Sequence, residues 1–391
     1  ASLDYDDPVQ IMKENARPRA SNSSTTGRYT LEEAMTDKPN FNLVLDNPNR
    51  KWTSGVEPPP HAKPDYVPFV PGTFPIVRLS LRALFANVDT ETIKAVVAHP
   101  DQYIAVRFLN GGSAFFARNP DIAEQVTKWL VSCNFDCEPF VARAEPRGPI
   151  DPKREFQPPN LAIISCASDS LRSWLIKGQT FIINKVLAFH ALKFDLDYIS
   201  FVTTRFTMGI KLTGPTHLQY ALATIKAALY PDPEFRRITL ELTQNLTGRK
   251  EDDRIRHALS SFYLELVDAD LGGNPAPYYL LTAKPLTTDH EKHDKWLETI
   301  NRRYQLPTFA AFLKPFPSRG TAAACSLCNS DLHHVKTCTL PTMERYNGPG
   351  AVTAADEATQ DALNCTAVRR MIQENPKGTA VPKGKGKPGR K

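Results

Sequence analysis

Residues 325–338 read Cys325-Ser-Leu-Cys328-Asn-Ser-Asp-Leu-His333-His-Val-Lys-Thr-Cys338, which is a C-x2-C-x4-H-x4-C spacing. Zinc prefers four sulfur and imidazole ligands at tetrahedral corners, with sulfur at about 2.3 Å and nitrogen at about 2.0–2.1 Å. Two cysteines separated by two residues can occupy one edge of that tetrahedron, and a short loop brings the histidine and the last cysteine to the other. So short a segment cannot fold by burial alone, and we expect Zn2+ to supply its folding free energy.

We therefore predict that Cys325, Cys328, His333 and Cys338 are zinc ligands. At this chain's own cysteine and histidine frequencies, the spacing arises by chance roughly once in twenty thousand chains of this length. His334 breaks the spacing, so we expect it to face solvent or to lie behind the ligands.

Basic residues are concentrated after this motif. The chain has 391 residues and a net charge of +6, and its last sixteen residues hold six Lys or Arg and no acid, while residues 1–375 hold 42 basic and 42 acidic residues. A Lys/Gly/Pro segment cannot bury apolar surface, and we predict a flexible polycation whose partner is a polyanion. The predicted nucleic-acid contacts are Lys336, Arg302, Arg303, Lys383, Lys385, Lys387, Arg390 and Lys391.

The motif, followed by Leu340-Pro341 and Asn347-Gly348-Pro349, resembles the CCHC zinc knuckle of gag-like proteins encoded by fungal transposable elements of the retrotransposon type. The layout is similar over roughly residues 75–350. This resemblance implies the same four zinc ligands and a non-catalytic, nucleic-acid-binding role. Two positions depart from the pattern, because Ser326 stands where such knuckles carry an aromatic and Leu332 where they carry a glycine. Leu327 and Val335 are the remaining candidates for an apolar base platform, and protein contact by the knuckle is the alternative.

The composition divides the chain into segments of different character. We expect an α+β fold with two small α/β units, the second ferredoxin-like or RRM-like, a zinc knuckle and disordered termini. The predicted boundaries are a Pro-rich, mostly disordered segment 1–72, an α/β domain 73–138, a Pro-rich linker 139–160, an RRM-like domain 161–306, a linker 307–322, the knuckle 323–342, a partly helical segment 343–375 and a basic tail 376–391.

Local patterns predict several elements of the two units. Asp89 is a plausible N-cap for a helix over 90–98, and residues 103–108 alternate like a strand. A second short strand is expected over 114–117, and a helix begins near Ile122. From Ser200 onward the order is strand, helix, an ambiguous stretch, two strands and a helix, which is compatible with an RRM-like topology.

Other candidates have ordinary structural interpretations. Phe201, Phe206, Tyr263, Tyr278 and Tyr279 fall on predicted strands, where we expect core packing, with base stacking on an open sheet face as the alternative. His290 and His293 are spaced i, i+3 rather than the i, i+4 of zinc proteases, which indicates a polar helix face.

Several classes of protein are disfavoured. No stretch of 18 consecutive apolar residues is present, which argues against a membrane span, and no secretory signal is evident. Seven cysteines, an odd number, favour a reducing, intracellular compartment, cytoplasmic or nuclear. Motifs for nucleotide-binding loops, hydrolases, retroelement proteases and polymerases are missing, so we do not expect an enzyme.

The sequence favours a zinc-dependent protein that binds nucleic acid, with single-stranded RNA as the favoured partner, and packages or chaperones a mobile-element transcript. The alternative is a capsid-like assembly protein that self-associates and whose knuckle mediates protein contacts.

Overall fold

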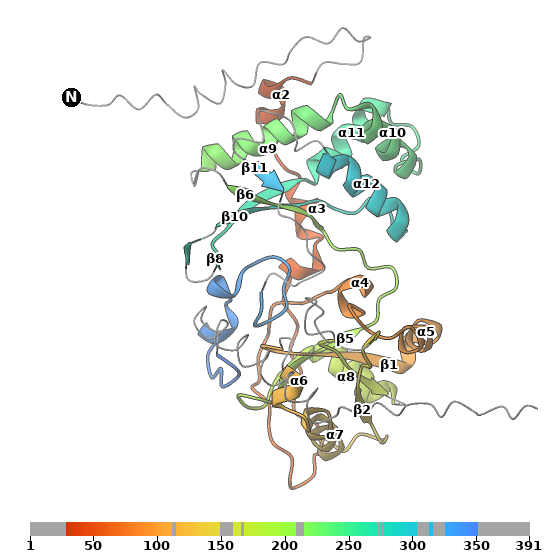
Figure 1. Ribbon diagram of the computed structural model, residues 1–391, viewed down its shortest axis with the longest axis vertical. Helices are drawn as coiled ribbons and strands as arrows, with labels where there is room; N and C mark the ends of the chain where they lie inside the picture. The colour runs from red at the N-terminus through yellow and green to blue at the C-terminus, as the bar shows by residue number, and fades with distance from the viewer. Residues whose placement is uncertain are drawn as a thin grey trace, which may run out of the picture.

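The computed structural model describes residues 29–111, 115–148, 159–165, 168–208, 215–271, 274–275, 277–302, 313–315 and 325–350. These residues form a mixed α+β protein with two large antiparallel sheets, and Figure 1 shows the two units stacked along the long axis. The predicted contacts Arg303, Lys383, Lys385, Lys387, Arg390 and Lys391 lie outside the described residues. So do residues 1–28 of the predicted segment 1–72, nearly all of the linker 307–322, residues 351–375 of the predicted helical segment and the tail 376–391. The expectation of disorder is wrong for residues 29–72, because the capping box at Thr30 starts the helix Leu31–Thr36 and a second helix follows at Phe41–Leu45.

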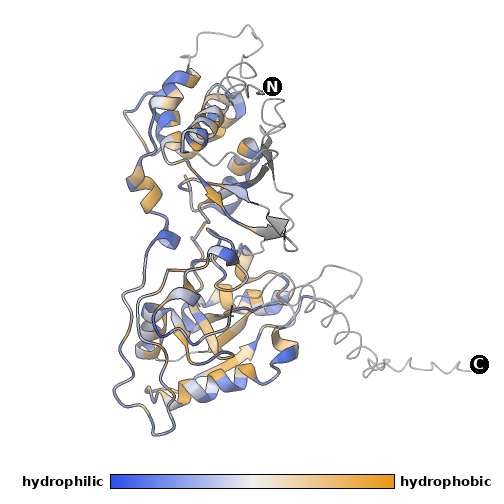
Figure 2. Ribbon diagram, turned by 90° about the vertical axis from the view of Figure 1, so that its left-hand side faces the viewer, coloured by the Kyte–Doolittle hydropathy of each residue, from blue (hydrophilic) through white to orange (hydrophobic). Residues whose placement is uncertain are grey.

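The first unit is built on a five-stranded sheet in the order β2-β3-β1-β5-β4. Its strands are β1 (Tyr103–Phe108), β2 (Phe140–Arg143), β3 (Ala162–Ser165), β4 (Thr180–Ile182) and β5 (Ala188–Lys193), and its helices are α4 (Leu81–Leu84), α5 (Thr90–Ala98), α6 (Phe115–Arg118), α7 (Ile122–Ser132) and α8 (Asp169–Gly178). Along β1, Ile104 and Val106 enter one apolar cluster and Ala105 enters another. Both faces of the sheet are therefore buried along β1, whereas the edge strand β2 is largely exposed, and the strands of this sheet are largely apolar in Figure 2.

This sheet corrects the predicted division of the chain at residues 139–160. β2 lies inside the predicted linker, and β3 pairs with both β1 and β2, so residues on either side of the linker belong to one sheet. The predicted start of the second domain at residue 161 is also wrong, because β3, β4 and β5 belong to the sheet of the first unit. The proline content of 139–160 does not indicate a linker here, because β2 is an edge strand and sheet edges tolerate flanking prolines such as Pro139.

Two of the three elements predicted from local patterns in this unit are confirmed. The helix over 90–98 and the strand over 103–108 are confirmed, and the Asp89 side chain accepts hydrogen bonds from the N–H groups of Glu91 and Thr92. The predicted strand over 114–117 is wrong, because Phe115–Arg118 is the short helix α6. Phe115 and Phe116 pack on Phe108 there, so tertiary contact overrode the β propensity of the run.

The second unit contains a four-stranded sheet in the order β11-β6-β10-β7. Its strands are β6 (Val202–Met208), β7 (Tyr263–Val267), β10 (Tyr278–Thr282) and β11 (Leu313–Pro315), with the small pair β8 (Asp270–Leu271) and β9 (Asn274–Pro275) between β7 and β10 in the chain. The helices α9 (Pro215–Leu229), α10 (Pro233–Leu242), α11 (Glu251–Ser260) and α12 (His290–Arg302) lie together on one side of this sheet in Figure 1, and α2 (Leu31–Thr36) packs on α9.

The core on the helix side of this sheet contains Phe206, Tyr279 and Trp296. His293 lies in α12 one turn before Trp296, is 5% exposed, and has its ring centroid 5.7 Å from that of Trp296. The prediction of a polar helix face is therefore wrong for His293. Burial lowers the pKa of His293 to about 4, so its imidazole is neutral in the core.

Within the described residues, two segments join the units. The first follows α3 (Phe41–Leu45) and contains the 3-10 turn η1 (Pro48–Arg50), and the second is residues 194–201. Residues 325–350, here called the CCHC segment, lie beside both units at this junction and contain η4 (Val335–Thr337) and η5 (Leu340–Thr342).

Candidate metal centre

The four predicted ligands converge on one point. One ligand atom from each of Cys325, Cys328, His333 and Cys338 lies within 4.8 Å of the other three. The Cys328 Sγ and His333 Nε2 atoms are 3.3 Å apart. A tetrahedron with arms of about 2.3 Å has edges of roughly 3.8 Å, so the side chains are already gathered at the separations that a metal requires. The cluster can hold a metal ion.

The backbone between the first two cysteines forms a tight turn. The N–H of Cys328 donates to the Cys325 Sγ at 3.4 Å, and the N–H of Asn329 donates to the Cys325 carbonyl at 3.0 Å. Asn329 has φ 62°, in the left-handed region where asparagine is among the best-tolerated residues. This turn aims both sulfurs at the same side.

The electrostatics of the thiols fit a bound cation. Hydrogen bonds from Cys328 and Cys338 lower the pKa of Cys325, whereas the hydrogen bond with Cys325 raises the pKa of Cys328. The first thiolate therefore opposes ionisation of its neighbours. A divalent ion relieves that repulsion, and a donor set of three sulfurs and one imidazole suits a soft or borderline metal.

The CCHC segment docks on the first unit. Leu327 is 1% exposed and Leu340 is 2% exposed, and both share an apolar cluster with Leu109 and Ile182 of that unit. The N–H of Asn110 donates to the Leu327 carbonyl at 2.7 Å. Leu327 was a candidate base platform, and its burial inside the protein excludes that role in the docked state.

Two polar side chains, the buried His190 and the half-buried Arg107, support this docking. His190, 1% exposed, donates from Nε2 to the Cys328 carbonyl at 2.9 Å, while its Nδ1 lies 3.0 Å from the Thr180 hydroxyl. Because a carbonyl only accepts, the proton is on Nε2, and Nδ1 accepts from Thr180. Arg107 donates to the Asn329 Oδ1 at 3.3 Å. Residues 328 and 329 of the CCHC segment are thus anchored to β1 and β5.

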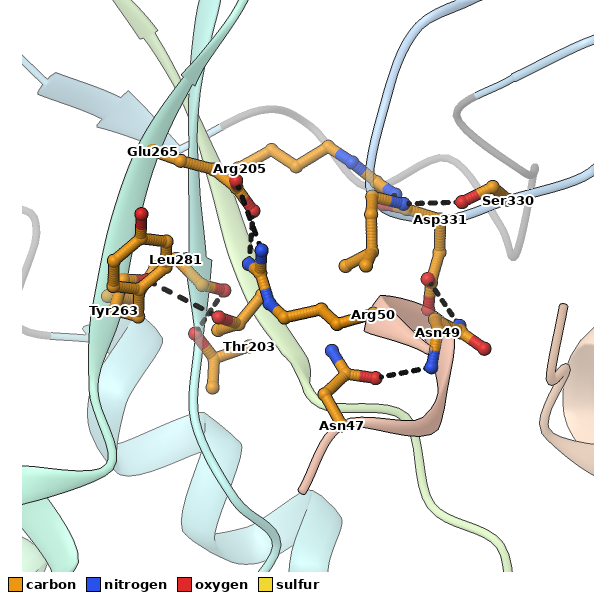
Figure 3. A network of polar contacts seen from close by, with 12 residues as sticks. Asn47, Asn49, Arg50, Thr203, Arg205, Tyr263, Glu265, Leu281, Ser330 and Asp331 are labelled. Carbon is orange, nitrogen blue, oxygen red and sulfur yellow. Dashed lines mark hydrogen bonds and ion pairs between the residues drawn. The ribbon is translucent and has the colours of Figure 1, made fainter. Parts of the chain in front are cut away.

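The same segment contacts the connecting segments and the second unit through Asp331 (Figure 3). One carboxylate oxygen accepts from the Asn49 side chain at 2.7 Å, as drawn in Figure 3. The other accepts from the Ser200 hydroxyl at 2.7 Å. Its carbonyl accepts from Arg205 of β6 at 3.3 Å. Asn49 and Ser200 belong to the two segments that join the units, so Asp331 binds both of these segments to the CCHC segment.

The sheet face of the second unit that lies opposite its core is covered at this junction. Arg205, Leu280 and Glu265 pair across β6, β10 and β7, so they share one face. Leu280 is fully buried in a cluster that includes Leu332 of the CCHC segment. Arg50 of η1 forms an ion pair with Glu265 at 2.5 Å. The CCHC segment and η1 therefore cover this row.

The aromatic candidates on these strands are packed within the protein. Phe206 and Tyr279 lie in the core on the helix side, which confirms the expectation of core packing for them. Tyr278 is 5% exposed and packs in the cluster on the opposite face. The Arg50 guanidinium lies 4.9 Å from the centre of the Tyr263 ring. Phe201 is half-buried.

The remaining described candidates have separate surroundings. Lys336 lies 3.4 Å from Asp268 in an ion pair. His334 is the N-cap of η4, its Nδ1 accepts from the N–H of Lys336, and it lies outside the Cys3His cluster. Arg302 is the last residue of α12. Sequence reasoning missed Asn49 and Asp331, because their importance arises from contacts between residues 282 positions apart.

The fold and the site define a mixed α+β protein with a Cys3His cluster able to hold a metal. Comparisons with protein-family models, with curated proteins and with solved structures find no match. Within the part of the chain that the structure describes, no helix has the length and apolar character needed to cross a bilayer.

Proposed function

We propose that this chain is a zinc-dependent, nucleic-acid-binding protein of the gag-like type, with single-stranded RNA as its favoured partner, acting inside the cell. The resemblance of residues 325–349 to fungal retrotransposon knuckles supports this role. The six basic residues of 376–391 supply the phosphate-neutralising charge, because they are accompanied by no acid. In this proposal the protein packages or chaperones a mobile-element transcript.

In this proposal the zinc-bound CCHC segment holds the two units together through its contacts with both, and we call this arrangement the clasp, which is closed when those contacts are made. One observation carries this part of the proposal. The Asp331 carboxylate binds Asn49 and Ser200 of the two connecting segments while Leu327 is buried against the first unit. Zn2+ suits the three sulfurs and one imidazole, and it would supply folding free energy to a segment that has little core of its own. The clasp then fixes how the two units are oriented.

The second unit is RRM-like in this proposal. Its order of elements is strand, helices, strand, strand, helix, strand, and its sheet order β11-β6-β10-β7 corresponds to 4-1-3-2. RNA-recognition motifs stack bases on the sheet face opposite the helices. Here Leu332, Asp331 and Arg50 occupy that face, so nucleic acid must contact other surfaces while the clasp is closed.

Fluorescence anisotropy of a labelled single-stranded RNA, titrated with full-length protein at several salt concentrations, tests this function. A chain ending at Asn375 should lose most of its affinity, and its salt slope should fall by up to about 4, at 0.7 per phosphate contact. A full-length chain with the six basic residues replaced by glutamine is the matched control for length. Absence of binding at moderate salt would refute the proposal.

Zinc binding and the contacts of the CCHC segment with both units are tested by a second experiment, which measures zinc content, hydrodynamic radius and melting temperature. The double variant Cys328→Ser/Cys338→Ser should lose bound zinc, enlarge the hydrodynamic radius and melt at a lower temperature. A variant that loses zinc but keeps the wild-type radius and melting temperature would refute the clasp without touching RNA binding.

An assembly protein is the second candidate, and a specific observation favours it. The CCHC segment makes protein contacts, and Phe140 on the edge strand β2 is 61% exposed. Multimers of nuclease-treated protein in light scattering, together with no RNA affinity, would support this alternative.

A further inference from the structure

A cavity of about 330 Å³ opens on the first unit next to the junction. It lies between the segment that follows η1, the chain that precedes α4, the end of α8 and the end of β5. Its polar and aromatic lining includes Trp52, Arg78, Lys177, Gln179, Lys193 and Asp195. The volume falls at the lower end of the range for small-molecule sites, about 300–1,000 Å³.

The charge around this cavity is positive. Arg78, Lys177 and Lys193 line it, and Asp195 is the one acidic residue among its lining residues. Asp195 binds Arg78 at 2.7 Å and Lys193 at 2.9 Å, while Lys177 is exposed at the end of α8. The lining therefore keeps a charge of about +2 at neutral pH, which favours an anionic occupant.

Trp52 gives the cavity an aromatic wall. Its side chain is 55% exposed, while Trp129 and Trp296 are at most 4% exposed. The backbone around Trp52 is fixed, because Trp52 bridges to Pro75 and the N–H of Thr53 donates to the Phe74 carbonyl at 2.8 Å. An exposed indole on an ordered backbone is a stacking surface, and base stacking contributes about 1–3 kcal/mol per base.

We propose that this cavity is a nucleotide subsite for single-stranded nucleic acid, in which a base stacks on Trp52 and the neighbouring phosphate contacts Lys177 and Arg78. The inference rests on the nucleic-acid-binding function proposed above and names a binding surface that the closed clasp leaves free.

The subsite is connected to the metal centre through Asn49. The Asn49 side chain accepts from the N–H of Arg78 at 2.6 Å and donates to its carbonyl at 3.1 Å, and it also donates to Asp331. The clasp therefore helps to position the backbone of one cationic wall of the cavity.

Tryptophan emission of the full-length, zinc-loaded protein tests the subsite, with unlabelled twelve-residue oligouridylate as the probe. The oligonucleotide should quench the emission of the wild type. Trp52→Phe should lose most of that quenching, whereas Trp174→Phe should keep it. In a separate anisotropy titration with the same oligouridylate carrying a fluorescent label, Lys177→Ala should weaken binding three- to tenfold. Lys292→Ala, which changes an exposed lysine of α12 outside the cavity lining, should weaken it less than twofold.

The outcomes separate the two proposals. Binding of the oligonucleotide that is unaffected by Trp52→Phe and Lys177→Ala would refute the subsite and leave the proposed function standing. Failure of the wild type to bind any oligonucleotide would refute both. Equal quenching by inorganic polyphosphate, which has no base, would overturn the stacking part of the inference.

Discussion

Replacing Asp331 with alanine should loosen the junction between the two units. The carboxylate accepts one hydrogen bond from Asn49 and one from Ser200, each at 2.7 Å. A hydrogen bond to a charged group contributes about 1.5–3 kcal/mol, and its loss leaves the donors without that partner. Since Asp331 is only partly buried, we expect Asp331→Ala to cost about 3 kcal/mol of unfolding free energy.

Calorimetry of the zinc-loaded chain provides the measurement. For domains of this size about 1 kcal/mol shifts the melting temperature by roughly 2–4 °C, so the expected fall is roughly 6–12 °C. Asp331→Asn keeps one acceptor oxygen in place and should show about half of that fall. Asp136→Ala removes an exposed carboxylate of the first unit and should leave the melting temperature within about 1 °C.

Zinc content must be measured for each variant, because a lost metal would lower the melting temperature for another reason. The reasoning about the junction is refuted if Asp331→Ala retains its zinc and has the same melting temperature as Asp136→Ala. It is also refuted if Asp331→Asn is as damaging as Asp331→Ala, because the acceptor geometry would then be irrelevant.

Three further predictions follow from buried contacts. Leu327→Ala should cost about 3 kcal/mol in urea unfolding because its side chain is buried, whereas a base platform would lose RNA affinity at unchanged stability. Arg50→Met should cost about 1–2 kcal/mol, since it removes a partly buried ion pair with Glu265, and Glu265→Gln should then add little in a double-mutant cycle. Between pH 7 and pH 5 the wild type should lose about 2 kcal/mol through His293, because burial lowers its pKa to about 4 and only the unfolded chain binds the proton in that window. His293→Leu should remove that share of the pH dependence, and an unchanged profile would contradict the assignment.

The Cys3His cluster could be predicted from sequence because its geometry is local. Cys325 and Cys328 share one turn, and His333 and Cys338 follow within ten residues, so the spacing alone restricts how the side chains can meet. The same holds for the helix that begins after Asp89, whose cap and apolar face lie within nine residues of one another.

The docking of the CCHC segment could not be predicted in this way. The His190 contact spans 138 positions and the Asn49 contact spans 282. No periodicity connects residues so far apart, because each contact depends on where whole sheets come together. The misplaced boundary at 139–160 has the same origin, since proline content describes the local chain and says nothing about the pairing of β2 with β3.

The side chains between the four cluster residues determine what the CCHC segment contacts. The four ligands fix only the cage, whereas Leu327, Asp331 and Leu332 project from it toward the two units. Relative to the zinc knuckles that the segment resembles, the sequence already differs at two positions, because Ser326 stands in place of an aromatic and Leu332 in place of a glycine. A buried leucine and a carboxylate that accepts two hydrogen bonds suit contact with a protein surface, because they match apolar groups and hydrogen-bond donors at fixed positions. Single-stranded nucleic acid instead calls for exposed aromatic and cationic groups, which this protein places at Trp52 and Lys177.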